Sequence, residues 1–172
     1  MQLDSKLRTQ IFLAFSAIVI ISLIIAGIQA SRQNESFLND YRQSVQAQEL
    51  LEQAKFAEAV PIYVSLLKSH DYYSVFYWQY GTCLAGQQKW DEAFAQYDKA
   101  RKIRPALMTE QTFLVQYGEL LYRTGHYKSS KQYLQQCLTY GADSKAGKVA
   151  KILLPMVEKQ LSLQKGGQAL DQ

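Results

Sequence analysis

The residues best suited to chemistry in this 172-residue chain are few and scattered. Asp91 and Glu92 are adjacent carboxylates, but they stand at the expected start of a helix, where acidic side chains complement the dipole and Asp91 can act as a cap. His70 and His126 fall in expected turns, and neither has a Cys or His at the spacing of metal ligands. These residues therefore predict neither a general acid and base nor a metal site.

The two cysteines and one Gly-Lys pair are explained without catalysis. Cys137 takes the position that Ala100 holds in a preceding, similar segment, so we interpret it as a small buried residue. A disulfide with Cys83 stays an open alternative, and the cysteines do not decide the compartment. Gly147 and Lys148 lack the glycine-rich approach of a phosphate loop. We expect a non-enzymatic protein without cofactor or metal.

Residues 11–28, IFLAFSAIVIISLIIAGI, contain no charge. At 1.5 Å per residue they span roughly 27 Å, close to the thickness of a bilayer core. This predicts a transmembrane helix at 11–29 after a short segment, 1–10. A cleaved signal peptide is the main alternative, but the run exceeds the usual apolar region of about 7–15 residues. A buried core helix is disfavoured because the run is apolar on all faces.

Charge around this run favours one orientation. Lys6 and Arg8 precede it, whereas Arg32 and Arg42 follow at greater distance. The positive-inside rule then places the N-terminus in the cytoplasm and the rest of the chain on the exported side of the cell membrane. The net charge of +4 is small and scattered, so we expect no nucleic-acid partner.

The rest of the chain repeats itself at a period of about 34–37 residues. Gly81 and Gly118 stand at matching positions in Tyr77-x2-Tyr80-Gly81-x2-Leu84 and Leu114-x2-Tyr117-Gly118-x2-Leu121. Each unit then has three residues spaced i, i+4 and i+7, which are Ala59, Tyr63 and Leu66; Ala93, Tyr97 and Ala100; and Ser130, Leu134 and Cys137. An aromatic ring precedes each triplet, namely Phe56, Trp90 and Tyr127.

These residues resemble the tetratricopeptide repeat, a helix–turn–helix unit with the signature W-x2-L-G-x2-Y, then A-x3-F, then P. The resemblance implies an all-α chain in which the transmembrane helix is followed by an α-solenoid of about three repeats and a capping helix. The expected parts are a linker at 30–39, repeats at about 40–73, 74–110 and 111–143, a capping helix at 144–163 and a flexible tail at 164–172.

Three features depart from the repeat pattern. Pro61 is expected to shift or bend the second helix of the first repeat, and Pro155 to kink or split the capping helix. Three extra residues after Pro105 are expected to lengthen the turn between the second and third repeats.

The resemblance implies that partners bind in a concave groove lined by the first helix of each repeat. The residues at these positions are Tyr41, Ser44, Gln48 and Glu52; Val75, Trp78, Thr82 and Ala85; and Thr112, Val115, Glu119 and Tyr122. The Lys, Arg and Asn of a carboxylate clamp are missing at Ser44, Gln48, Trp78 and Thr82. The groove is therefore expected to hold an extended segment or helix of another protein. Trp78 has an alternative role, packing against a neighbouring repeat.

Lys145, Lys148 and Lys151 recur every three residues along the capping helix. They form either a solvated face or a basic edge for an anionic partner or lipid headgroups.

These patterns predict a membrane-anchored scaffold or adaptor that serves a membrane or secretion complex. It looks like bacterial envelope adaptors with one N-terminal anchor and an exported repeat domain. The expected partners are other proteins in the groove and the lipid bilayer around residues 11–29, and the oligomeric state stays open. One alternative is an integral subunit whose membrane helix packs on other subunits. A secreted or glycan-binding module is another.

Overall fold

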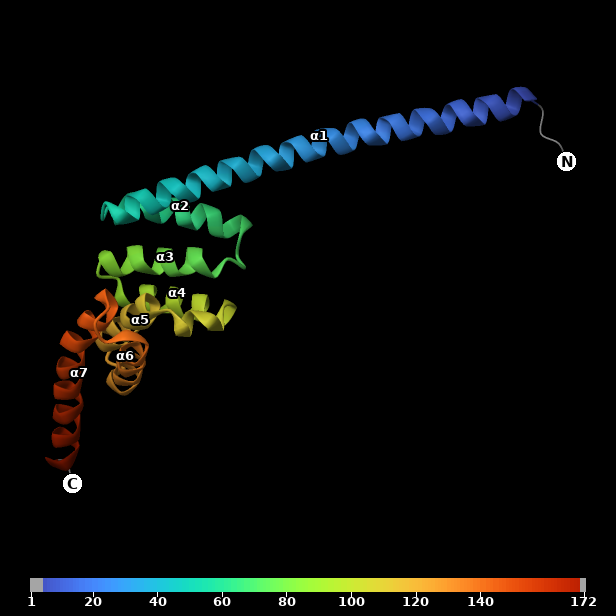
Figure 1. Ribbon diagram of the computed structural model, residues 1–172. Helices are drawn as coiled ribbons and strands as arrows, with labels where there is room; N and C mark the ends of the chain where they lie inside the picture. Colours follow the sequence, from blue (N-terminus) through green and yellow to red (C-terminus); the bar gives the residue numbers. More distant parts are fainter. Residues whose placement is uncertain (1–4, 171–172) are drawn as a thin grey trace. The chain divides into compact units, whose positions relative to one another are not determined.

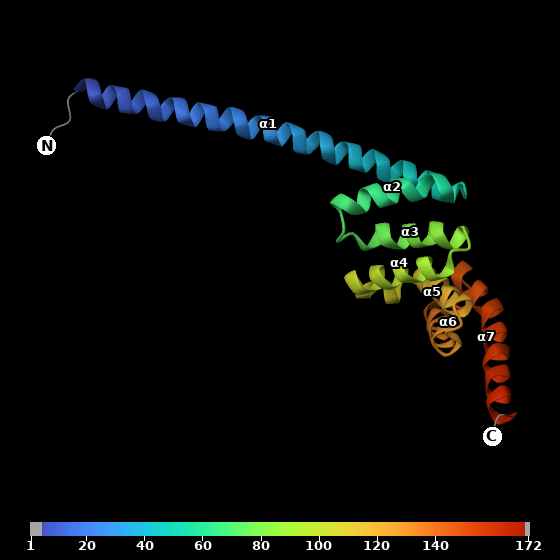
Figure 2. The same cartoon turned by 180° about the vertical axis from the view of Figure 1, so that it is seen from behind.

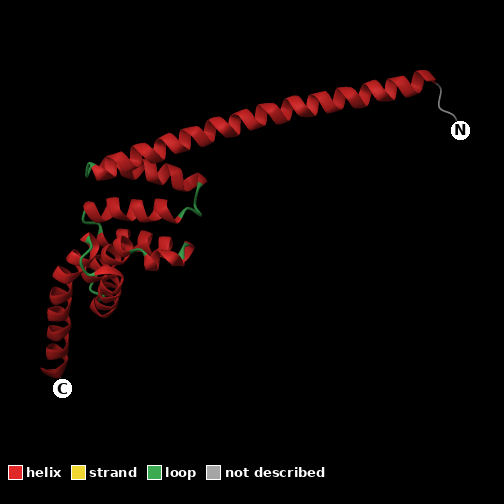
Figure 3. Cartoon of the chain, in the orientation of Figure 1, coloured by secondary structure: helices red, strands yellow, loops and turns green. Residues whose placement is uncertain are grey.

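The computed structural model describes residues 5–170, nearly all of them helical (Figure 3). This part of the chain contains no strand, and the predicted all-α class is confirmed. The elements in order are α1 (Ser5–Glu52), α2 (Phe56–Ser69), α3 (Ser74–Gly86), α4 (Trp90–Ile103), the 3-10 helix η1 (Pro105–Thr109), α5 (Gln111–Arg123), α6 (Tyr127–Gly141) and α7 (Lys145–Leu170).

The chain divides into two units, Met1–Gln43 and Ser44–Gln172. The first contains the apolar run, whose large side chains are exposed along α1. By length and composition α1 is the one described helix able to cross a membrane, and no part of its most apolar window is buried. A signal sequence near an N-terminus passes the same test, so that alternative stays open.

The polar stretch at 30–39 differs from the expected linker because it lies inside α1. It contains neither Gly nor Pro, so nothing in its backbone chemistry interrupts the helix that enters it. The expected tail at 164–172 is likewise helical as far as Leu170, and its last two residues lie outside the described part.

The second unit stacks its helices in repeats. Helices α2, α3 and α4 lie side by side in both views, and α5, α6 and α7 follow (Figures 1 and 2). All nine residues of the three predicted triplets are buried, as the repeat pattern required. Gly81 and Gly118 lie directly against large side chains of the next helix. A Cβ on Gly81 would lie 2.5 Å from Tyr97 Cδ2, and one on Gly118 would lie 2.8 Å from Leu134 Cδ2. Small residues therefore let the paired helices approach closely.

The first helix of each repeat ends in the same turn. Ala54, Gln88 and Gly125 all have left-handed backbones, with φ of 58°, 62° and 80°. The next residue donates its backbone N–H to the carbonyl five positions earlier, for example Lys89 to Leu84 at 3.0 Å. This is the Schellman pattern of helix ends, and it satisfies carbonyls that the helix leaves without partners.

Neither proline interrupts the helix that contains it, and the fold accommodates the insertion and the cysteines. Pro61 lies inside α2 without shifting its start from Phe56, and Pro155 lies inside an unsplit α7. The insertion after Pro105 forms η1, which buries Leu107. The two cysteines are buried and free, and they belong to different core clusters, so the disulfide alternative is not formed.

Candidate partner-binding groove

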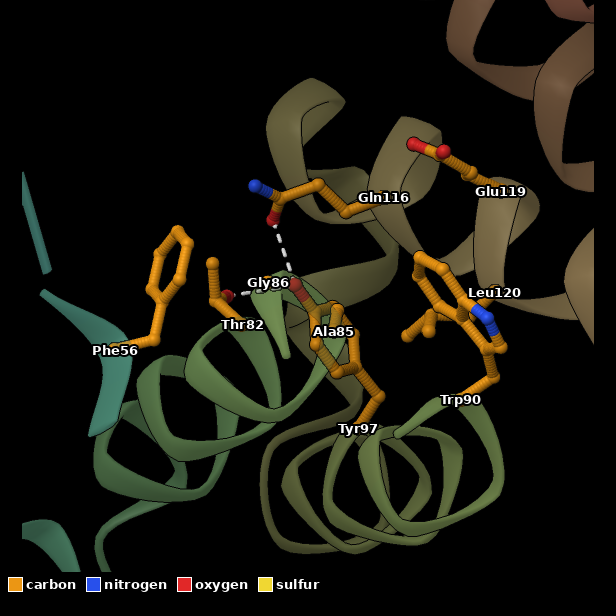
Figure 4. A pocket seen from close by; sticks show the side chains of 9 residues that line it. All are labelled: Phe56, Thr82, Ala85, Gly86, Trp90, Tyr97, Gln116, Glu119 and Leu120. Atoms are coloured by element: carbon orange, nitrogen blue, oxygen red, sulfur yellow. Dashed lines mark hydrogen bonds between the residues drawn. The ribbon is translucent and has the colours of Figure 1, made fainter. Parts of the chain in front are cut away.

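A hollow of about 260 Å³ opens between α3, α4 and α5. Figure 4 shows Phe56 on one side of it and Trp90 and Leu120 on the other. Thr82, Tyr97 and Gln116 place polar atoms among these apolar walls. The lining residues are Phe56, Thr82, Ala85, Gly86, Trp90, Tyr97, Gln116, Glu119 and Leu120.

A second hollow of about 370 Å³ lies between α5 and α7. Its lining residues are Thr112, Val115, Gln116, Glu119, Lys145, Ala146 and Val149. Gln116 and Glu119 of α5 line both hollows, so the two hollows adjoin along this helix. We call the two hollows together the groove.

Gln116 is the best-positioned polar side chain in the groove. Its Oε1 accepts a hydrogen bond from Trp78 Nε1 at 2.8 Å and another from the Tyr97 hydroxyl at 2.9 Å. An indole N–H can only donate, so the oxygen of the amide must face Trp78. Figure 4 shows the amide nitrogen turned away from Tyr97. No described residue accepts a hydrogen bond from that nitrogen, which is left as a donor for a ligand.

The Tyr97 hydroxyl stays neutral in this hydrogen-bond network. Burial raises the pKa of its hydroxyl well above the ordinary value, an effect that the hydrogen bond with Thr82 and the nearby indole N–H of Trp78 only partly oppose. The Thr82 hydroxyl lies 2.8 Å from the Tyr97 hydroxyl and 3.0 Å from the Trp78 carbonyl oxygen. The hydroxyl of Tyr97 therefore stays protonated and able to donate to Gln116.

Trp78 packs against the next repeat. Its ring meets Phe113 edge-on with centroids 5.4 Å apart, and its N–H is bonded to Gln116. The half-buried Trp78 therefore has the alternative role expected for it, packing against a neighbouring repeat. It contributes to the groove by orienting Gln116.

The other predicted residues divide into two sets. Thr82, Ala85, Thr112, Val115 and Glu119 line the groove as expected from their positions in the repeat. Val75, Tyr122 and the positions on α1 do not line either hollow; on α1 these are Tyr41, Ser44, Gln48 and Glu52. Gln48 instead donates to Glu52 at 3.1 Å, and Tyr122 packs against Tyr127 with ring centroids 5.7 Å apart.

Sequence reasoning missed several lining residues. Gln116 stands four residues after Thr112 and three before Glu119, a spacing that places all three on one helix face and could have indicated it. Trp90 belongs to the repeat pattern only as the aromatic ring that precedes the second triplet. The others missed were Phe56, Gly86, Tyr97 and Leu120 in the first hollow, and Ala146 and Val149 in the second.

The three lysines predicted as a basic edge do not act alike. Lys145 lines the second hollow, and Lys148 is exposed. Lys151 forms an ion pair with Asp143 at 3.0 Å. Across the groove, the Glu119 carboxylate is paired with Arg123 at 3.2 Å. The available positive charge therefore lies at the α7 end of the groove.

The described residues contain no group of three or more His, Cys, Asp or Glu that could hold a metal ion. The polar side-chain groups that line the groove include amides, hydroxyls, the Glu119 carboxylate and the Lys145 ammonium.

Comparison with solved structures supports this interpretation of the fold. A complex of the type III secretion system from Aeromonas hydrophila matches with a TM-score of 0.60 and 16% identity, over 72% of this chain and 83% of that chain. The TPR2B domain of yeast Sti1 in a complex with Hsp70 matches with a TM-score of 0.55 and 18% identity, over 73% and 97%. The fold is that of tetratricopeptide repeat domains.

A third structure is the type III secretion chaperone SycD of Yersinia enterocolitica with a peptide of the translocator YopD. It matches with a TM-score of 0.56 and 18% identity, over 73% of this chain and 93% of that chain. No family model and no curated protein matches the chain. The comparisons therefore show the fold, and the groove itself must indicate what it binds.

Proposed function

We propose that this protein is a non-enzymatic, membrane-anchored scaffold whose groove binds an extended segment or helix of a partner protein. The observation that carries the proposal is the Gln116 amide, held by Trp78 and Tyr97 so that its nitrogen is left as a donor among apolar walls. Such a donor suits the main-chain carbonyl of a bound segment, while the walls accept an apolar side chain.

The similar structures support this type of ligand. The Sti1 domain is in a complex with Hsp70, and SycD holds a peptide of its translocator. By analogy with these proteins, a protein segment is the class of ligand we assign to the groove.

The membrane part of the proposal rests on α1. Residues 11–29 would cross the bilayer, with the N-terminus in the cytoplasm and the repeats on the exported side. There the groove would recruit a partner for the assembly or working of a membrane or secretion complex.

The test uses the full chain in intact membranes, with the photoreactive residue p-benzoylphenylalanine at Thr112, which is exposed and lines the second hollow. Illumination is expected to form an adduct with a protein. In Gln116→Glu, an oxygen can still accept from Trp78 and Tyr97, but the donor is gone. We expect the adduct yield to fall at least tenfold, since the segment then meets an acceptor where it needs a donor.

Gln132→Glu is the matched control, because it makes the same chemical change on an exposed part of α6. Its adduct yield should stay within twofold of the unchanged chain. Equal yields from both variants would contradict the role of Gln116, and the absence of any protein adduct at Thr112 would contradict the proposed function.

A further inference from the structure

Helix α7 carries two apolar faces. Ala150, Leu153 and Val157 form the buried one, packed with residues of α5 and α6. The other consists of Val149, Ile152, Met156 and Leu163, which are 38%, 68%, 44% and 58% exposed. Their spacing of three, four and seven residues places them along one side of the helix. We call these four residues the outer stripe.

The outer stripe is bordered by positive charge. Lys145, Lys148 and Lys159 fall on the same side of α7 at 100° per residue, and all three are exposed. None of them forms an ion pair within the described residues, whereas Lys151 is paired with Asp143 at 3.0 Å. The helix's own Glu158 is paired with Lys131 of α6 at 2.7 Å. The surface thus combines uncovered apolar area with uncompensated cations.

The outer stripe continues the groove. Val149 belongs to the stripe and also lines the second hollow, together with Lys145. A segment leaving the groove past Glu119 would therefore reach the stripe without crossing an unrelated surface. From Val149 to Leu163 the stripe runs about 21 Å, which is four turns of a helix.

We propose that the outer stripe binds an acidic amphipathic helix of the same partner whose adjoining segment lies in the groove. This inference rests on the proposed function. The helix would place apolar residues at i, i+3 or i+4, and i+7 against the stripe and carboxylates beside Lys145, Lys148 and Lys159. A second copy of this chain is a poorer fit, because its lysines would face these lysines across the contact.

The test places p-benzoylphenylalanine either at Ile152 of the stripe or at Thr112 of the groove, in the full chain in intact membranes. We expect both positions to form adducts with one protein, and the peptide attached to position 152 to be acidic and amphipathic. The double change Lys148→Glu and Lys159→Glu should lower the position-152 yield at least fivefold and leave the position-112 yield within twofold. Lys128→Glu with Lys68→Glu, exposed on α6 and α2, is the charge-matched control.

The possible outcomes separate this inference from the proposed function. Two outcomes overturn the stripe assignment alone. One is adduct formation at position 112 without any at position 152, and the other is a position-152 yield that the charge reversal leaves unchanged. An adduct of position 152 with phospholipid instead of protein also overturns it, in favour of an anionic membrane surface. Failure at both positions overturns the groove and the stripe together. A thermal unfolding profile of each variant by circular dichroism confirms that it is folded.

Discussion

Single side chains join the second repeat to the third. Asp98 of α4 accepts from Arg101 at 2.5 Å and forms an ion pair with Lys102 at 2.6 Å. The Tyr117 hydroxyl of α5 reaches the same carboxylate at 3.5 Å. Tyr117 also stacks on Phe94 with ring centroids 5.7 Å apart, so this cluster adds a polar and an aromatic contact to those that connect α4 to α5.

This cluster predicts an acid-side loss of stability. Burial alone would raise the pKa of Asp98, but hydrogen bonds from Lys102 and Arg101, with their charges, lower it below its ordinary value. A lowered pKa in the folded state stabilises the fold above the unfolded pKa, and this contribution disappears as the pH falls through the folded value. Asp98→Asn should cost about 0.5–1 kcal/mol at neutral pH, the range of partly exposed pairs, and flatten the acid-side slope.

The measurement is chemical unfolding of the full chain in detergent as a function of pH. Asp143→Asn serves as the control, because its carboxylate is 96% exposed although it also pairs with a lysine. An unchanged acid-side slope in Asp98→Asn would show that this carboxylate does not couple protonation to folding.

At the scale of elements, the repeated turns matter because two of the three use residues poorly suited to them. Ala54 and Gln88 take the left-handed conformation that only Gly125 adopts without penalty. Since the conformation costs a residue with a Cβ roughly 1–2 kcal/mol, each of these turns is held by the helices it connects.

Gln88→Gly is therefore expected to stabilise the second repeat by about 0.5–1 kcal/mol, after allowing for the extra freedom of Gly in the unfolded chain. Gln87→Gly is the matched control, because Gln87 has φ of −88° and gains nothing from glycine. Chemical unfolding compares the two. A Gln88→Gly protein no more stable than the Gln87→Gly protein would contradict the strain assigned to this turn.

The same turns show which elements the sequence could predict. The buried triplets and the glycine slots follow from helical periodicity and a repeat signature, which depend on residues close in the chain. Two other features could not be predicted in this way. The left-handed turn at Gln88 has no glycine to indicate it, and the helix continues through 30–39 only because no Gly or Pro interrupts it.

The candidate groove was predicted only in part for a different reason. Thr112 and Glu119 were expected from the repeat, but the orientation of Gln116 is set by Trp78 and Tyr97, which lie 38 and 19 residues away. Periodicity within one helix cannot specify such a contact.

At the scale of the whole molecule, α1 has two alternative roles. It either only attaches the chain to the membrane or also packs on other subunits as part of a membrane complex. We expect replacement of residues 11–28 by eighteen residues of mixed Leu and Ala to leave the Thr112 photoadduct within twofold, because the groove lies entirely in the second unit. Membrane flotation confirms that the chimera stays attached.

Loss of the adduct in an attached, folded chimera would favour the integral-subunit alternative, in which the natural helix packs on other membrane helices. A chimera that is released from the membrane after processing would instead indicate a signal sequence.

The two tryptophans of the chain have a practical consequence. Trp90 lines the groove beneath the Arg123 guanidinium, 5.1 Å from its ring, and Trp78 donates to the side chain we assign to ligand binding. Tryptophan emission excited at the red edge of its band therefore comes only from these two rings. The unmodified protein carries its own optical reporter of groove occupancy, and a titration needs no attached dye.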